Sequence, residues 1–204
     1  MENIFILIGD SLTFGYGVPS NDRWTYNLSK RIPIKIINKG INGNTTVNML
    51  DRFYNDVTSK CPKYVFIMGG TNDLLTGKSV SSIIKNLVVM IEEIKPITPN
   101  IYIGIPPRIN KDMAEKLFSP SDFYDYCSKS LPILRKNIIN LCNENSINYI
   151  DFYKLTNDNF TNNIYLDGIH LNSLGNTLML SEILKRLKFW LYIFCCYFTS
   201  FQSI

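Results

Sequence analysis

The chemistry open to this sequence is limited first by its histidines, because the 204 residues contain only one, His170. Serine is a weak nucleophile until a nearby base removes its proton, and at neutral pH imidazole suits that task best. Any serine–histidine mechanism must therefore use His170. Asp167 precedes it by three residues in the segment DGIH. One turn of chain would bring this carboxylate to the other ring nitrogen, where it would orient the ring and stabilise the imidazolium.

A candidate nucleophile, Ser11, stands in a glycine-rich turn directly after an apolar run. The run IFILI covers residues 4–8, and GDSLTFGYG follows over 9–17. A serine just past the end of a buried strand is placed where its hydroxyl can meet a substrate. A lone GDS tripeptide is more often a helix cap or a turn, so this segment gains weight only together with His170.

Acyl transfer also needs hydrogen-bond donors fixed where negative charge develops on the substrate oxygen. Two glycine-bearing segments offer such donors, KGINGNTT at 39–46 and GGTND at 69–73. Glycine lets a backbone N–H approach a ligand closely, and the side chain of Asn72 is a further donor. Each segment taken alone is typical of a tight turn.

These segments need a scaffold that brings them together, and the rest of the sequence predicts one. Short runs rich in β-branched and aromatic residues predict strands over 4–8, 34–38, 63–68, 101–105 and 147–152. Segments with helical periodicity lie near 22–31, 45–57, 79–95, 121–145 and 173–190. The alternation predicts a three-layer α/β/α sandwich around a five-stranded parallel sheet, with function at the carboxyl ends of the strands. Ser79 is expected to cap the third helix, and Asn172 or Ser173 the last.

Together, four segments resemble the SGNH (GDSL-type) hydrolase family in their order and approximate spacing: GDSLTFGYG, INGNTT, GGTND and DGIHLN. The resemblance covers residues 4 to about 188 and implies a flavodoxin-like α/β/α fold. It implies that Ser11, His170 and Asp167 form a catalytic triad. It also implies an oxyanion hole made by the backbone N–H groups of Ser11 and Gly43 and by the side chain of Asn72.

The activity that this resemblance implies is hydrolysis of carboxylic esters or thioesters through an acyl-serine intermediate, with a small-molecule acyl ester as substrate. A sugar O-acetylesterase is the alternative among enzymes. A non-catalytic protein that uses the fold to bind a partner is the alternative from another class. The pocket walls are expected from 14–24 and from 106–120, a proline-bounded surface excursion, with Phe14, Tyr16 and Trp24 as substrate-binding residues. Asn42 departs from the family, in which serine is common at that place, but removes no catalytic group.

Composition limits the partners and cofactors. The net charge is only +4, and the lysines and arginines are scattered, so nucleic-acid binding is not expected. A single histidine without a cysteine cluster argues against a zinc site, and we expect neither metal nor cofactor. A magnesium site formed by Asp10, Asp73 and Asp167 is the alternative.

The two ends of the chain bear on its location. The apolar run at 4–8 is too short for a signal peptide, and five cysteines without a CxxC pair are typical of reduced thiols, so a cytoplasmic protein is expected. We expect a hydrolase domain over 1–188 and an apolar tail over 189–204. Its run FWLYIFCCYF is shorter than the roughly twenty residues that span a bilayer. Packing of this tail is the simplest interpretation, with contact to a membrane surface or a second subunit as alternatives. The oligomeric state is not predicted.

Overall fold

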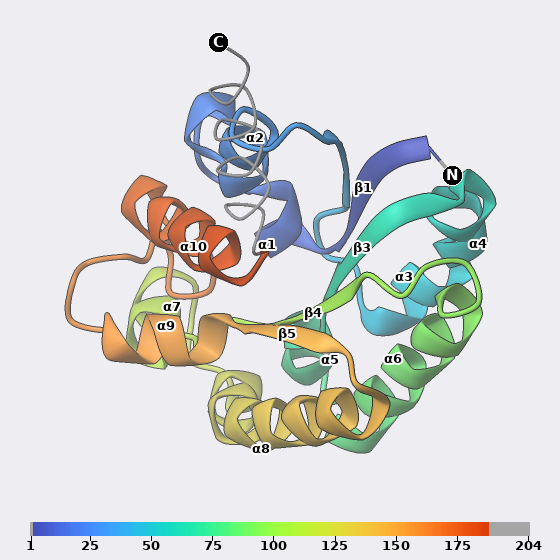
Figure 1. The fold of residues 1–204 in the computed structure, drawn as a ribbon. Coiled ribbons are helices and arrows are strands. Elements are labelled where there is room, and N and C mark those ends of the chain that lie inside the picture. The colour runs from blue at the N-terminus through green and yellow to red at the C-terminus, as the bar shows by residue number, and fades with distance from the viewer. Residues whose placement is uncertain (1, 188–204) are drawn as a thin grey trace, which may run out of the picture.

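Five runs of apolar and β-branched residues form the parallel sheet that the sequence predicts (Figure 1). In the computed structural model, which describes residues 2–187, the strands are β1 (Glu2–Gly9), β2 (Lys35–Gly40), β3 (Pro62–Met68), β4 (Ile101–Ile105) and β5 (Asn148–Asp151). Their order across the sheet is β2-β1-β3-β4-β5, and each neighbouring pair is parallel.

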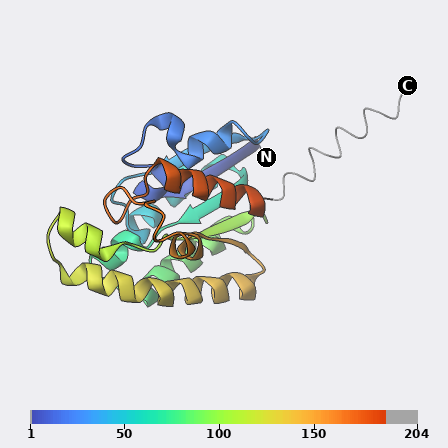
Figure 2. The ribbon, with the colours of Figure 1, turned by 90° about the vertical axis from the view of Figure 1, so that its left-hand side faces the viewer.

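Helices follow the strands and cover both faces of the sheet. They are α1 (Ser11–Phe14), α2 (Trp24–Ser29), α3 (Thr46–Asp51), α4 (Phe53–Asp56), α5 (Thr71–Leu75), α6 (Val80–Ile94), α7 (Lys111–Leu117), α8 (Asp122–Asn145), α9 (Phe152–Asp158) and α10 (Ser173–Arg186), with short 3-10 helices at Ser20–Asp22 and Thr58–Lys60. Helices α3, α4, α6 and α8 pack on one face, and α2, α9 and α10 pack on the other. Figure 2 looks onto the second face, with α10 in front. The predicted three-layer α/β/α sandwich is confirmed.

The alternation of side chains along β1 creates the two cores. Ile4, Ile6 and Ile8 point to the face covered by α6 and α8, while Phe5 and Leu7 point to the face covered by α2 and α10. All five of these side chains are buried. Strand β4 is buried at every residue, as expected for an inner strand of a parallel sheet covered on both faces.

Several predicted boundaries agree with the structure and several do not. Ser79 caps α6, and Asn172 caps α10, as predicted. The single helix expected over 45–57 is interrupted at Arg52 and forms α3 and α4. The expected surface excursion at 106–120 contains α7, which Asn110 caps.

Short helices were not predicted, because α1, α5 and α9 begin at the strand ends and are too short to show a helical period. Helix α10 ends at Arg186. The described residues end at 187, so the expected helix over 188–190 and the tail over 189–204 lie outside them. The boundary at 188 therefore stays a prediction. Between residues 2 and 187, no helix has the length and apolar character needed to cross a membrane.

Candidate active site

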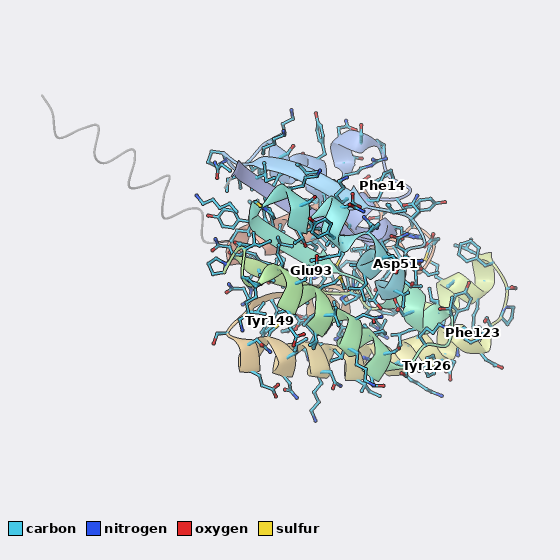
Figure 3. The ribbon with its side chains drawn as sticks, turned by 90° about the vertical axis from the view of Figure 1, so that its right-hand side faces the viewer. Phe14, Asp51, Glu93, Phe123, Tyr126 and Tyr149 are labelled. Carbon is cyan, nitrogen blue, oxygen red and sulfur yellow. The ribbon has the colours of Figure 1, made fainter. Side chains whose placement is uncertain are left out.

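Three neighbouring strand ends place the candidate segments side by side. Gly9, the last residue of β1, is in register with Gly40 of β2 and with Met68 of β3. The segments GDSL, INGN and GGTND leave these three strands and therefore begin at one edge of the sheet. Figure 3 shows Phe14, Phe123 and Tyr126 toward this end of the molecule, and Glu93 and Tyr149 toward the other.

Helix α1 presents Ser11 as its first residue. The preceding Asp10 caps the helix, since its carboxylate Oδ1 accepts a hydrogen bond from the N–H of Leu12 at 2.9 Å. Burial raises the pKa of Asp10 to about 6, although the Leu12 hydrogen bond and His170 work in the opposite direction. Ser11 itself is only 6% exposed.

Two short contacts connect Ser11, His170 and Asp167. His170 Nε2 lies 2.8 Å from Ser11 Oγ, and His170 Nδ1 lies 2.7 Å from Asp167 Oδ2. Burial would raise the pKa of Asp167, but hydrogen bonds from the His170 ring and from backbone N–H groups outweigh it and hold the pKa below its usual value. The structure thus brings together the three residues that the sequence suggested for a triad.

The loop over 167–170 is held by its own turn and by α7. Asp167 Oδ1 accepts hydrogen bonds from the backbone N–H groups of Ile169 at 2.9 Å and His170 at 2.7 Å. Gly168 has a φ of +92°, and a Cβ at this position would lie 2.5 Å from the carbonyl oxygen of Asn110. Only glycine fits this close approach without displacing the backbone. Asn110 also donates its N–H to the carbonyl of Gly168 at 2.7 Å.

The two predicted oxyanion donors outside α1 lie in neighbouring segments, Gly43 in the turn after β2 and Asn72 in the first turn of α5. Gly43 has a φ of +77°, and a Cβ there would meet nothing within 4 Å, so the loop faces open space. Asn72 Nδ2 donates to the carbonyl oxygen of Asn44 at 3.0 Å. The buried carboxylate of Asp73 accepts hydrogen bonds from the N–H and the hydroxyl of Thr46, which attaches α5 to α3. These contacts bring Asn72 next to the Gly43–Asn44 turn.

The three predicted substrate-binding residues occupy different surroundings. Tyr16 is 44% exposed, and its ring centroid lies 4.5 Å from that of His170. It also lines a small cavity of about 10 Å³ beside Ser11. The ring of Phe14 lies under the guanidinium of Arg23 at 4.3 Å. Trp24 departs from the expectation, because it is fully buried in the core, where its indole N–H donates to the carbonyl of Leu12 at 2.9 Å. Trp24 therefore supports α1 from the core and does not line the site.

Metal binding finds no support in the described part of the chain. Within residues 2–187, no group of three or more His, Cys, Asp or Glu side chains is arranged to hold a metal ion. The three aspartates of the magnesium alternative are used separately: Asp10 caps α1, Asp73 binds Thr46, and Asp167 binds His170.

Two polar residues near the site were not singled out from the sequence. Asn176 on α10 accepts a hydrogen bond from the N–H of Trp24 and donates to the carbonyl of Leu171, so it joins α2 to the histidine loop. Arg52, between α3 and α4, binds the carbonyl of Gly9 and the side chain of Asn44. No local pattern marks either residue, because the contacts of Asn176 with Trp24 and of Arg52 with Gly9 join segments that are distant in sequence.

The chain matches the model of the GDSL-like lipase/acylhydrolase family over residues 7–178. It belongs to this family, in agreement with the resemblance of its four segments.

Parts of two curated proteins are similar to the chain. An arylesterase from Vibrio mimicus is 31% identical over 121 residues, which are 55% of this chain and 60% of that protein. The uncharacterized lipoprotein YqeF of Bacillus subtilis (strain 168) is 40% identical over 110 residues, 45% of each protein. The chain thus spans less than two thirds of the length of the curated relatives it matches.

A solved structure with the same fold comes from Veillonella parvula DSM 2008 and is described as a member of the lipolytic protein G-D-S-L family. It superposes with a TM-score of 0.78 at 24% identity and covers 89% of this chain and 96% of that one. At this level of identity the likeness concerns the fold.

Proposed function

We propose that this chain hydrolyses carboxylic esters, with Ser11 as the nucleophile, His170 as the general base and Asp167 as the residue that orients the ring. One observation carries the proposal: His170 Nε2 lies 2.8 Å from Ser11 Oγ, and His170 Nδ1 lies 2.7 Å from Asp167 Oδ2. Both distances are within the range for proton transfer between positioned groups. Family membership and the arylesterase relative support the same reaction class.

In the acylation half, Ser11 Oγ attacks the ester carbonyl carbon while His170 Nε2 accepts the hydroxyl proton. The Asp167 carboxylate stabilises the imidazolium that forms. The carbonyl oxygen becomes an oxyanion, and the tetrahedral intermediate collapses when the C–O bond to the alcohol breaks. His170 returns its proton to the departing alcohol oxygen, which leaves an acyl-serine.

In the deacylation half, a water molecule attacks the acyl-serine carbonyl carbon, and His170 Nε2 accepts a proton from that water. Collapse of the second tetrahedral intermediate breaks the bond to Ser11 Oγ. The proton on His170 passes to the serine oxygen, the carboxylic acid leaves, and the enzyme returns to its starting state.

The oxyanion would bind the backbone N–H groups of Ser11 and Gly43 and the side chain of Asn72. A primary amide has two N–H donors. One hydrogen of Asn72 Nδ2 is directed to the Asn44 carbonyl, which leaves the other for the substrate oxygen. The Asn44 contact thus fixes the amide before substrate arrives, and donors fixed in advance stabilise a developing charge best.

A sugar O-acetylesterase is the alternative among enzymes, and it differs from a lipid esterase in the length of the acyl group that the site accepts. A series of p-nitrophenyl esters tests the acyl group: for an O-acetylesterase, kcat/KM should be highest for acetate and decline toward octanoate. A maximum at octanoate would contradict this alternative.

Labelling with a fluorophosphonate tests the catalytic proposal against a binding protein that only keeps the fold. Ser11 should become covalently modified, as seen by mass spectrometry of its peptide, and Ser11→Ala should prevent both labelling and ester hydrolysis. A folded wild-type protein that neither reacts nor hydrolyses p-nitrophenyl acetate would point to the non-catalytic alternative.

A further inference from the structure

Arg52 connects three segments around the candidate site. Its guanidinium Nε donates to Asn44 Oδ1 at 2.8 Å, its Nη2 donates to the carbonyl oxygen of Gly9 at 3.1 Å, and its Nη1 donates to Asp56 Oδ2 at 2.7 Å. The side chain is 16% exposed, so these contacts are largely shielded from water. A planar group with donors on all three nitrogens suits such an arrangement, and a lysine ammonium could not reproduce it.

The partners of Arg52 belong to the segments that carry the proposed catalytic groups. Gly9 ends β1, two residues before Ser11. Asn44 follows Gly43, and its carbonyl oxygen accepts the hydrogen bond from Asn72. One guanidinium therefore connects the turn that contains Gly43 and binds Asn72 to the end of the strand that precedes Ser11.

A further ion pair holds the guanidinium in place. Asp56 Oδ2 accepts from Arg52, and Asp56 Oδ1 accepts from Lys39 at 2.7 Å. Partial burial alone would raise the pKa of Asp56, but the hydrogen bonds from Lys39 and Arg52 outweigh it and keep the pKa below its usual value. The carboxylate thus stays charged at neutral pH and orients the guanidinium on the side away from Asn44.

We infer that Arg52 is a positioning residue for the oxyanion hole: by holding Asn44 against the end of β1, it places the Gly43 N–H and the Asn72 amide relative to Ser11. This inference rests on the proposed function. An arginine that only stabilises the fold would not act in this way. Because a shift of the donors weakens binding of the transition state more than binding of the substrate, loss of Arg52 should lower kcat more than it changes KM.

Arg52→Ala should lower kcat by about 10–100-fold on p-nitrophenyl acetate, because a misplacement of roughly 1 Å can cost that much. KM should change less than about twofold. Added guanidinium ion at millimolar concentration should restore part of kcat in Arg52→Ala and have no effect on the wild type. A role in folding alone would not predict this rescue.

Asn44→Ala removes the acceptor of Arg52 Nε but keeps the backbone carbonyl that binds Asn72. It should lower kcat to a similar extent, and the Arg52→Ala/Asn44→Ala double variant should be little worse than either single variant, because both break the same contact. If Arg52→Ala does not fold, Asn44→Ala still decides the question, since a wild-type kcat in this variant would overturn the inference.

Arg135→Ala provides a matched control. Arg135 forms a similar ion pair with Asp151, with its Nε at 2.8 Å and its Nη2 at 2.7 Å from the carboxylate, but Asp151 ends β5, and β3 and β4 separate β5 from β1. This variant should melt at a lower temperature with kcat unchanged. An equal loss of kcat in Arg135→Ala and Arg52→Ala would overturn the inference, as would additive effects of the Arg52 and Asn44 changes. The proposed function is tested separately, by the loss of activity in Ser11→Ala.

Discussion

The buried carboxyl of Asp10 should make the stability of this protein depend on pH in a specific way. Its side chain is 1% exposed, and burial raises its pKa from the ordinary value of 3.8 to about 6. Leu12 N–H binds one carboxylate oxygen, whereas the other, Oδ2, has no hydrogen-bond partner among the described residues. The neighbouring Asp73 adds repulsion, while His170 acts in the opposite direction.

The direction in which the free energy of unfolding changes with pH follows from proton binding to Asp10. Between pH 4 and 6 the folded protein holds the Asp10 proton more tightly than the unfolded chain does, so the free energy of unfolding falls as pH rises through this range. The rise of the pKa from 3.8 to about 6 corresponds to about 3 kcal/mol, at about 1.4 kcal/mol per pKa unit. The fall is nearly complete by about pH 7, one unit above the pKa of the folded state.

Asp10→Asn isolates the effect, because asparagine keeps the acceptor for Leu12 N–H and does not titrate. Urea unfolding of both proteins between pH 4 and pH 7.5 gives the difference in the free energy of unfolding at each pH. The wild type should lose about 2 kcal/mol relative to Asp10→Asn between pH 4 and pH 7, whatever the constant offset between the two, because the rest of the loss lies below pH 4. A difference that stays flat, or that favours the wild type as pH rises, would refute this reasoning.

Three other predictions address the donors, the histidine loop and the tail. Asn72→Ala should lower kcat by roughly 10²–10³-fold with little change in KM, as measured by steady-state kinetics; a rise in KM at constant kcat would mark Asn72 as a substrate-binding residue instead. Gly168→Ala places a methyl group 2.5 Å from the Asn110 carbonyl at a φ of +92° and should lower both the melting temperature and kcat, whereas wild-type values for both would show that α7 yields easily. Deletion of residues 191–204 should preserve most of the activity on a soluble ester; its loss in a variant that still melts cooperatively would mean that the tail contributes to the site.

The sheet could be predicted from the sequence because each strand is a short, nearly continuous apolar run. The caps at Ser79 and Asn172 could be predicted because each side chain accepts a hydrogen bond from the backbone N–H three residues further on, which is a local pattern. The interruption at Arg52 could not, since nothing local at 45–57 differs from a continuous helix. At the interruption, the Arg52 side chain contacts Asn44 and Gly9. The contact with Gly9 forms only in the folded protein, so a local pattern does not predict it.

The candidate site was predictable where the chemistry limits the choice of residue. Only one histidine exists, and the three-residue interval from Asp167 to His170 suits a single turn, which the structure contains. The role of Trp24 was less accessible, because an aromatic residue after a loop can face either the core or the opening. In the structure the indole N–H of Trp24 donates to the Leu12 carbonyl, and the ring lies in the core.

If Ser11 and His170 act as one catalytic unit, the kinetics of three variants should show it. Ser11→Ala, His170→Ala and the double variant should be assayed on p-nitrophenyl acetate after circular dichroism has shown that each is folded. Each single variant should lose about 10⁴–10⁶-fold in kcat, and the double variant should be no worse than either. Losses that multiply in the double variant, or a His170→Ala protein that keeps roughly a tenth of the wild-type rate, would contradict this prediction, because the serine would then act without this histidine as its base.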